Sequence, residues 1–236
     1  MKSNKLTLFI MVFTQILLTS VLYAQRDVTQ FLGIPIDGSK PEMIKKLKDK
    51  GFTINPYYKD VLEGEFNGTK VTLHVVTNKN KVYRIMVVDA YSTSETDIKI
   101  RFNKLCRQFQ NNKMYLSPSL SDSSYIIPEK EDISYELLVN NKRYEAVFYQ
   151  QPTKELDSIE VQRVLHEIIL KKYTKEQLSN PTEEIKNDII EEGLSYMMDL
   201  YSKKVVWFMI SEDNYGEYSI NMYYDNIYNK ADGEDL

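Results

Sequence analysis

The sequence has a single cysteine and only two histidines, and this scarcity removes several classes of site. Cys106 cannot form an internal disulfide, so we expect the fold to depend on its core. Because it lies on the apolar stripe of a predicted helix, we expect a buried side chain rather than a reactive thiol. Neither His74 nor His166 has a second histidine or a cysteine at metal-ligand spacing, and we expect both to be structural.

The common catalytic and cofactor-binding motifs are also missing. The sequence has no Gly-rich phosphate loop and no Gly-x-Ser-x-Gly nucleophile elbow. Residues 212–216 combine acidic side chains with a glycine, but their spacing differs from that of a calcium loop. We therefore predict no cofactor and no metal site. A carboxylate-dependent hydrolase stays open as an alternative, because glycoside hydrolysis needs only two carboxylates that the fold brings together.

Basic charge is not in excess. Thirty lysines and arginines face thirty-four aspartates and glutamates, for a net charge of −4. An acidic, well-mixed surface argues against nucleic acid as a partner, since phosphates need clustered basic side chains. No basic amphipathic stretch indicates binding to a membrane surface.

The N-terminus has the pattern of a cleavable signal peptide over residues 1–24. Lys2 and Lys5 precede a run without charge from residue 6 to residue 22, and Ala24 is a small residue at the expected cleavage site. The rival interpretation is an uncleaved anchor, but polar residues interrupt the run and it is short for a membrane span. Position 25 is Gln25 rather than cysteine, so we expect no lipid anchor. The product is predicted to be periplasmic or secreted, without a stable membrane anchor.

The first half of the mature chain predicts a helix followed by a meander of strands. Ser39 and Glu42 form a capping box, and Gly51 ends the helix. A short strand is expected at residues 52–56. Further strands are expected at 62–66, 70–77 and 81–89, with Asn67-Gly68 as the first hairpin turn.

A similar order follows. A second helix is predicted at 93–111 with a capping box of Ser92 and Glu95, then a short segment at 114–118. The expected strands after it are 123–127, 133–139 and 143–150. The two units form a degenerate helix-plus-meander repeat with a period of about 60 residues.

The last part of the chain differs from both units. Helices are predicted at 154–173 and at 180–201, the second starting at Asn180-Pro181. Strands at 204–211 and 217–225 close the chain, and the tail from Ala231 is acidic.

These elements predict an α+β fold: antiparallel sheet with helices packed on one face. We divide the mature chain into two parts. Residues 25–150 form an α+β domain of two helix-plus-meander units. Residues 151–236 form a helical pair and a C-terminal β-hairpin, packed on the first part.

Aromatic residues gather near the C-terminus and are the candidate binding residues. Tyrosine is abundant, with eighteen in the chain, and it suits half-exposed sheets and interfaces. Alternation puts Tyr218 and Tyr224 on one face of the last strand and Tyr223 on the other. One face should be core and the other could recognise a partner; the alternative is sheet packing with wet hydroxyls. The candidates are Trp207, Tyr215, Tyr218, Tyr223, Tyr224 and Tyr228.

Several segments resemble uncharacterised exported proteins of anaerobic gut bacteria. They are residues 31–38 (Phe-Leu-Gly-Ile-Pro-Ile-Asp-Gly), 50–52, 62–90, 144–150 and 223–236. The helix-then-meander unit is also distantly similar to the repeats of β-lactamase inhibitor protein and of small outer-membrane assembly lipoproteins. Those modules are non-catalytic and bind other proteins, and the likeness is one of topology alone.

The sequence therefore favours a non-catalytic exported binding module that recognises a protein or peptide partner in the cell envelope. The alternatives are a carboxylate-dependent hydrolase or glycan-binding protein, and a structural component of an envelope complex.

Overall fold

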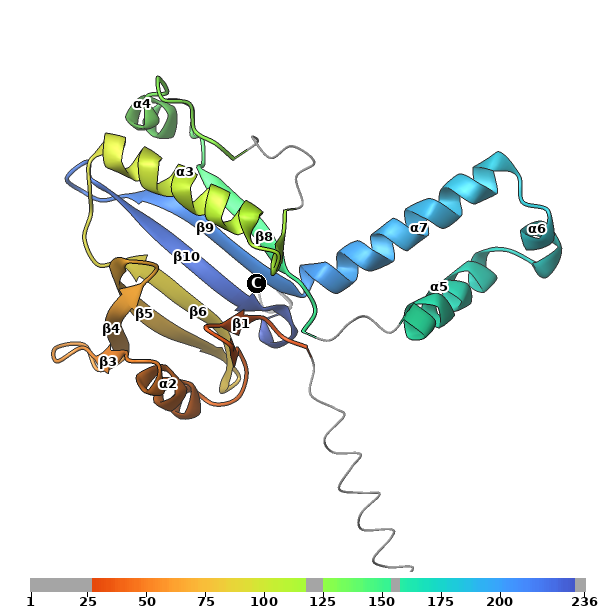
Figure 1. Ribbon diagram of the computed structural model, residues 1–236, viewed down its shortest axis with the longest axis horizontal. Coiled ribbons are helices and arrows are strands. Elements are labelled where there is room, and N and C mark those ends of the chain that lie inside the picture. The colour runs from red at the N-terminus through yellow and green to blue at the C-terminus, as the bar shows by residue number, and fades with distance from the viewer. Residues whose placement is uncertain (1–26, 118–124, 154–157, 232–236) are drawn as a thin grey trace, which may run out of the picture.

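The computed structural model describes residues 27–117, 125–153 and 158–231 (Figure 1). The predicted signal peptide, residues 1–24, lies outside the described residues, as does the end of the acidic tail. Among the helices of the described part, none is long and apolar enough to cross a membrane.

The first half of the chain forms the predicted helix and meander. The Ser39–Glu42 capping box is present, and Asn67 and Gly68 both adopt the left-handed backbone conformation that a tight hairpin turn requires. The elements are β1 (Gln30–Phe31), β2 (Ile34–Pro35), α2 (Lys40–Asp49), β3 (Thr53–Ile54), β4 (Val61–Phe66), β5 (Thr69–Asn78) and β6 (Lys81–Asp89).

The second helix, α3 (Glu95–Asn111), begins later than predicted, and its capping box was wrong. The cap is Ser94, whose side chain accepts a hydrogen bond from the Asp97 N–H. Thr93 exchanges two backbone hydrogen bonds with Tyr218, which hold residue 93 in an extended conformation. The helix can therefore start only after this bridge.

The prediction of a strand at 133–139 was also wrong. Residues Ile133–Leu138 form a short helix, α4, capped by the Asp132 side chain on the Tyr135 N–H. The alternation of apolar and polar residues at its start imitates a strand, but Ile133 is buried and its N–H donates to Glu95 of α3. Residues 125–127 are not a strand either. The remaining elements here are β7 (Tyr115–Leu116) and β8 (Glu145–Gln150).

In the residues that the structure describes, the last part contains three helices and the predicted hairpin. The helices are α5 (Ser158–Lys172), α6 (Lys175–Ser179) and α7 (Glu183–Ser202). Thr182, rather than Asn180, caps α7, and the short α6 was not predicted. The hairpin consists of β9 (Lys204–Glu212) and β10 (Tyr218–Asn226), and a turn of 3-10 helix follows at Ile227–Asn229.

One antiparallel sheet runs through the molecule in the order β3-β4-β5-β6-β10-β9-β8-β7. The C-terminal hairpin therefore lies at its centre, between β6 and β8, so that both parts of the chain supply strands to one sheet. The helix-plus-meander repeat is not shown, since α4 stands where the second unit would have a strand.

Strand alternation gives the sheet a buried and a half-exposed face. Leu73, Val87, Met222, Phe208 and Ala146 stand in one row across five strands, and all are buried. The helices α2 and α3 pack on this side, as Figure 1 shows, whereas α5 and α7 extend beyond the end of the sheet. The predicted α+β class with helices on one face is thus confirmed, and Cys106 is buried in α3.

Candidate functional site: the open face of the sheet

The two faces of β9 and β10 separate the predicted aromatic residues. Tyr218 and Tyr224 point into the core, where they are 2% and 3% exposed. Tyr223 lies half-exposed on the opposite side, as alternation predicted, and Trp207 lies half-exposed on that side too. We call this opposite side the open face.

Trp207 and Tyr223 form the centre of the open face. They stand directly opposite one another in the β9–β10 register, and their rings stack with centroids 4.0 Å apart at an angle of 19°. The Arg84 guanidinium, from the neighbouring strand β6, lies 4.7 Å from the centre of the Tyr223 ring and 5.5 Å from that of Trp207. Such cation–π contacts fix the orientation of both partners.

A buried carboxylate holds this stack in place. Arg84 Nε donates to Asp225 Oδ1 over 2.6 Å, and Nη2 donates to Oδ2 over 2.7 Å. Trp207 Nε1 donates to the same Oδ2 over 3.2 Å. Hydrogen bonding to Asp225 raises the pKa of Arg84 above its usual value. The carboxylate, 2% exposed, therefore orients both the guanidinium and the indole.

A β-bulge brings a further ring to the stack. In the β5–β6 pairing, Val76 faces Arg84 and Thr77 faces Val82, which leaves Tyr83 as the extra residue. Val82 and Ile85 are buried, so Tyr83 and Arg84 both lie on the open face. The Arg84 guanidinium is 5.7 Å from the Tyr83 ring.

Apolar side chains surround the stack and stay half-exposed. They come from β5, β6, β8 and β9, in the row of the Trp207–Tyr223 pair and in the rows on either side of it. An apolar sheet face of this kind is unusual on a surface that contacts only water. Its members are Val76, Met86, Val88, Val147, Tyr149, Val205 and Met209.

The other predicted site residues lie elsewhere. Tyr215 is at the tip of the β9–β10 turn and is 91% exposed, and Tyr228 belongs to the 3-10 helix after β10. The structure thus brings together Trp207 and Tyr223 of the six candidates. Arg84 and Asp225 were missed, although the break in alternation at residues 82–85 was a signal that could have indicated a bulge.

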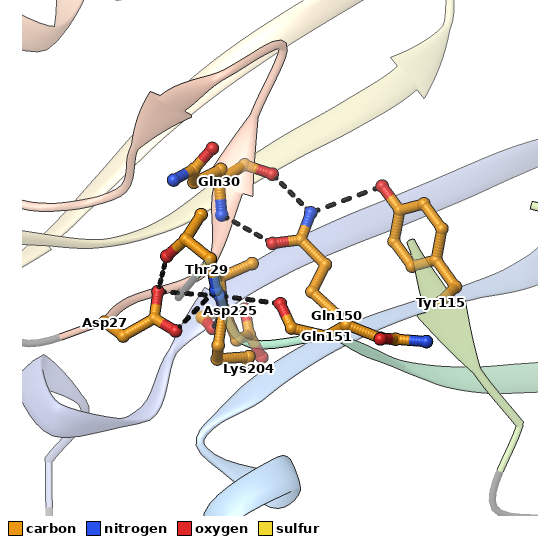
Figure 2. Close-up of polar contacts among 9 residues, drawn as sticks. Asp27, Thr29, Gln30, Tyr115, Gln150, Gln151, Lys204 and Asp225 are labelled. Carbon is orange, nitrogen blue, oxygen red and sulfur yellow. Dashed lines mark hydrogen bonds and ion pairs between the residues drawn. The ribbon is translucent and has the colours of Figure 1, made fainter. Parts of the chain in front are cut away.

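A polar network anchors the N-terminal segment beside this site (Figure 2). Lys204, which is buried, donates from Nζ to Asp27 Oδ1 over 2.8 Å and to the Gln151 carbonyl over 3.0 Å. The Thr29 hydroxyl donates to the backbone carbonyl of Asp225. The network therefore ties Asp27 to β9 and Thr29 to β10, at the end of the two strands near Asp225.

Gln150 makes the second connection in Figure 2. Its side-chain oxygen accepts from the Gln30 N–H over 2.8 Å, and its amide nitrogen donates to the Gln30 carbonyl and to the Tyr115 hydroxyl. Buried polar groups that are matched in this way stabilise a fold, and we assign the network a structural role.

Within the described residues, no group of three or more histidine, cysteine, aspartate or glutamate side chains is placed to hold a metal ion. Comparison with known proteins finds no match, since neither a family model, nor a curated protein, nor a solved structure matches this chain.

Proposed function

We infer that the chain is a non-catalytic exported binding module whose open face recognises a protein or peptide partner in the cell envelope. One observation carries this inference: the Trp207–Tyr223–Arg84 stack, held by the buried carboxylate of Asp225, at the centre of a half-exposed apolar face.

The composition of this face supports a protein partner. Tryptophan, tyrosine and arginine are the residues that contribute most to binding energy at protein interfaces. Here stacking and hydrogen bonds fix their side chains before any partner arrives, so little conformational entropy remains to be lost on binding. A sheet face that extends over several strands also suits the extended contact area of a protein better than the small area of a metabolite.

The same geometry narrows the chemistry of the partner. The charge of Arg84 is matched by Asp225, so an anionic group gains little from it. The inner faces of Trp207 and Tyr223 cover one another, which leaves less ring surface for a sugar to stack on. We therefore expect the partner to present an apolar, uncharged surface.

The experiment is affinity capture from envelope extracts with residues 25–236 as bait, followed by affinity measurement with the purified partner. Trp207→Ala is compared with Tyr215→Ala, which removes an exposed aromatic ring outside the open face. We expect Tyr215→Ala to bind like the original protein and Trp207→Ala to bind at least ten-fold more weakly, about 1.4 kcal/mol or more, as at interface hot spots.

Thermal unfolding of both variants is the control for folding. If Trp207→Ala and Tyr215→Ala bind the captured partner with equal affinity, the open face is not the binding surface. Binding to glycans with no specific protein captured would replace the proposal by the glycan-binding alternative.

A further inference from the structure

The opposite side of the sheet contains a cavity beside helix α3. The cavity, of about 440 Å³, opens between α3, the β4–β5 hairpin and the β1–β2 turn. This volume falls within the range of small-molecule pockets. Because β10 separates it from the open face, the site is independent of the proposed function.

Two aromatic pairs form much of the wall. Phe66 and Tyr224 meet edge to face with ring centroids 6.5 Å apart, and Phe109 and Tyr115 do so at 4.6 Å. All four residues line the cavity. A further ring placed between them would find both ring edges and ring faces, which is the arrangement that aromatic groups prefer.

The deep part of the cavity is uncharged. Tyr224 and Tyr115 share a hydrogen bond through their hydroxyls, and burial raises the pKa of Tyr224 well above its usual value. Gln150 donates to the Tyr115 hydroxyl over 3.2 Å. Both hydroxyls are therefore already hydrogen-bonded, so a guest needs no polar group at this depth.

The mouth of the cavity carries amides and one charge. Asn67 at the tip of the β4–β5 hairpin donates to Gln108 of α3 over 2.7 Å, and both residues line the opening. Glu65 also lines it and disfavours an anionic guest. The amides can exchange hydrogen bonds with a neutral polar substituent.

Leu32 gives an independent observation at the same place. It has a φ of +50°, in the left-handed region that leucine rarely adopts, and together with Gly33 it forms the β1–β2 turn. Its side chain is 41% exposed and lines the cavity. Asparagine or glycine would adopt this backbone with less strain, so the leucine contributes little to the turn itself.

We propose that this cavity binds an uncharged aromatic group, with Leu32 closing over it from the β1–β2 turn and the Phe66–Tyr224 and Phe109–Tyr115 pairs packing around it. The group belongs either to a free small molecule or to a side chain of a peptide. Strain at Leu32 is then the cost of placing an apolar side chain over the bound ring.

The test uses two-dimensional amide NMR of residues 25–236 titrated with indole, N-acetyltryptophanamide and indole-3-acetate. We expect saturable shifts for Leu32, Asn67 and Gln108 with the two uncharged probes, and at least ten-fold weaker binding of the anion. Tighter binding of indole indicates a small molecule as the source, and tighter binding of the amide indicates a peptide side chain.

The variant Leu32→Asn separates a binding role from a structural one. We expect it to unfold at the same or a higher temperature than the original chain, yet to bind the preferred probe at least ten-fold more weakly. Ile100→Asn, which removes an exposed apolar side chain of α3 outside the cavity, is the matched control and should bind normally.

Three results would overturn the proposal: no saturable shift at the cavity, unchanged affinity in Leu32→Asn, or binding of the anion as tight as that of indole. Shifts confined to Trp207 and Tyr223 would also overturn it, since they place the probe on the open face. Trp207→Ala should leave probe binding at the cavity unchanged, so this site and the proposed function can fail separately.

Discussion

Asp225 and Arg84 form a two-pronged ion pair between the central strands β10 and β6, in direct register with one another. The carboxylate is buried, whereas the arginine side chain is 20% exposed and lies against the Trp207–Tyr223 stack. The pair thus connects the hydrogen bonds beneath the sheet surface to the aromatic group that we propose as the binding centre.

Removal of both partners of this pair should cost less stability than the two single removals added together. Asp225→Asn leaves the guanidinium without its carboxylate, and Arg84→Met leaves a buried carboxylate without its cation. We expect each to lower the free energy of unfolding by about 3 kcal/mol, as is usual when one partner of a buried pair is lost. The double variant should lose less than the sum of the two. Urea denaturation in a double-mutant cycle measures the coupling, and additive losses would contradict it.

Two glycines should respond in opposite directions to replacement by alanine. A methyl group on Gly64 of β4 would overlap the Phe52 ring, whereas one on Gly193 of α7 meets open space. We expect Gly64→Ala to destabilise the fold by about 1–3 kcal/mol through overpacking. Gly193→Ala should stabilise it by up to about 1 kcal/mol, because alanine favours a helix interior. Thermal unfolding followed by circular dichroism compares the two, and an equal shift in both variants would count against this packing.

The Cys106 thiol should not react with thiol reagents while the protein is folded. Burial among the apolar residues of α3 and the sheet raises the pKa of its thiol to about 12. Little thiolate exists at pH 8, and a reagent has no access to it. We expect a thiol-specific disulfide reagent to react only as the protein unfolds in guanidinium. Rapid reaction in buffer alone would show that α3 opens readily.

Asp27 should make stability fall in acid. Burial alone would raise the pKa of its carboxyl, but hydrogen bonds from Lys204 and Thr153 outweigh burial and lower that pKa below its usual value. A lowered pKa stabilises the fold above the unfolded value near 3.8, and this contribution is lost as the pH falls through the folded pKa.

The variant Asp27→Asn tests this link. At pH 7 it keeps an oxygen that can accept from Lys204 but leaves the buried ammonium without its negatively charged partner, and we expect a loss of about 1–2 kcal/mol. The difference from the original protein should shrink as the pH is lowered from 7 toward 2, because the ionic contribution is lost as the Asp27 carboxyl becomes protonated. Asp60→Asn, at an exposed ion pair with Lys40, is the control and should change stability little at either pH. A loss that is the same at both pH values would exclude the ionic contribution.

Local sequence patterns predicted those features that depend only on residues close together in the chain. The Ser39–Glu42 cap, the Asn67-Gly68 turn and the alternation that separates Tyr223 from Tyr224 depend on neighbouring residues, and the structure contains all three. The prediction of a strand at 133–139 failed because a period-two pattern can also fit a short capped helix whose first residue is buried.

The site residues that were missed depend on contacts between distant segments. Arg84 reaches Asp225 because β6 and β10 are neighbours, although 141 positions separate them in the chain. The cavity needs the β1–β2 turn, the β4–β5 hairpin and α3 together. Patterns within one sequence indicate which face of a strand is buried and where a helix ends. They do not indicate the order in which strands lie in the sheet.

The most direct test of the binding proposal uses Trp207, the only tryptophan in the chain, as its own reporter. Acrylamide quenching of its fluorescence is measured with and without saturating amounts of the captured partner. A partner that covers the open face should lower the quenching constant at least two-fold, and Tyr215→Ala should show the same change. An unchanged quenching constant at saturation would contradict the claim that the open face binds the partner.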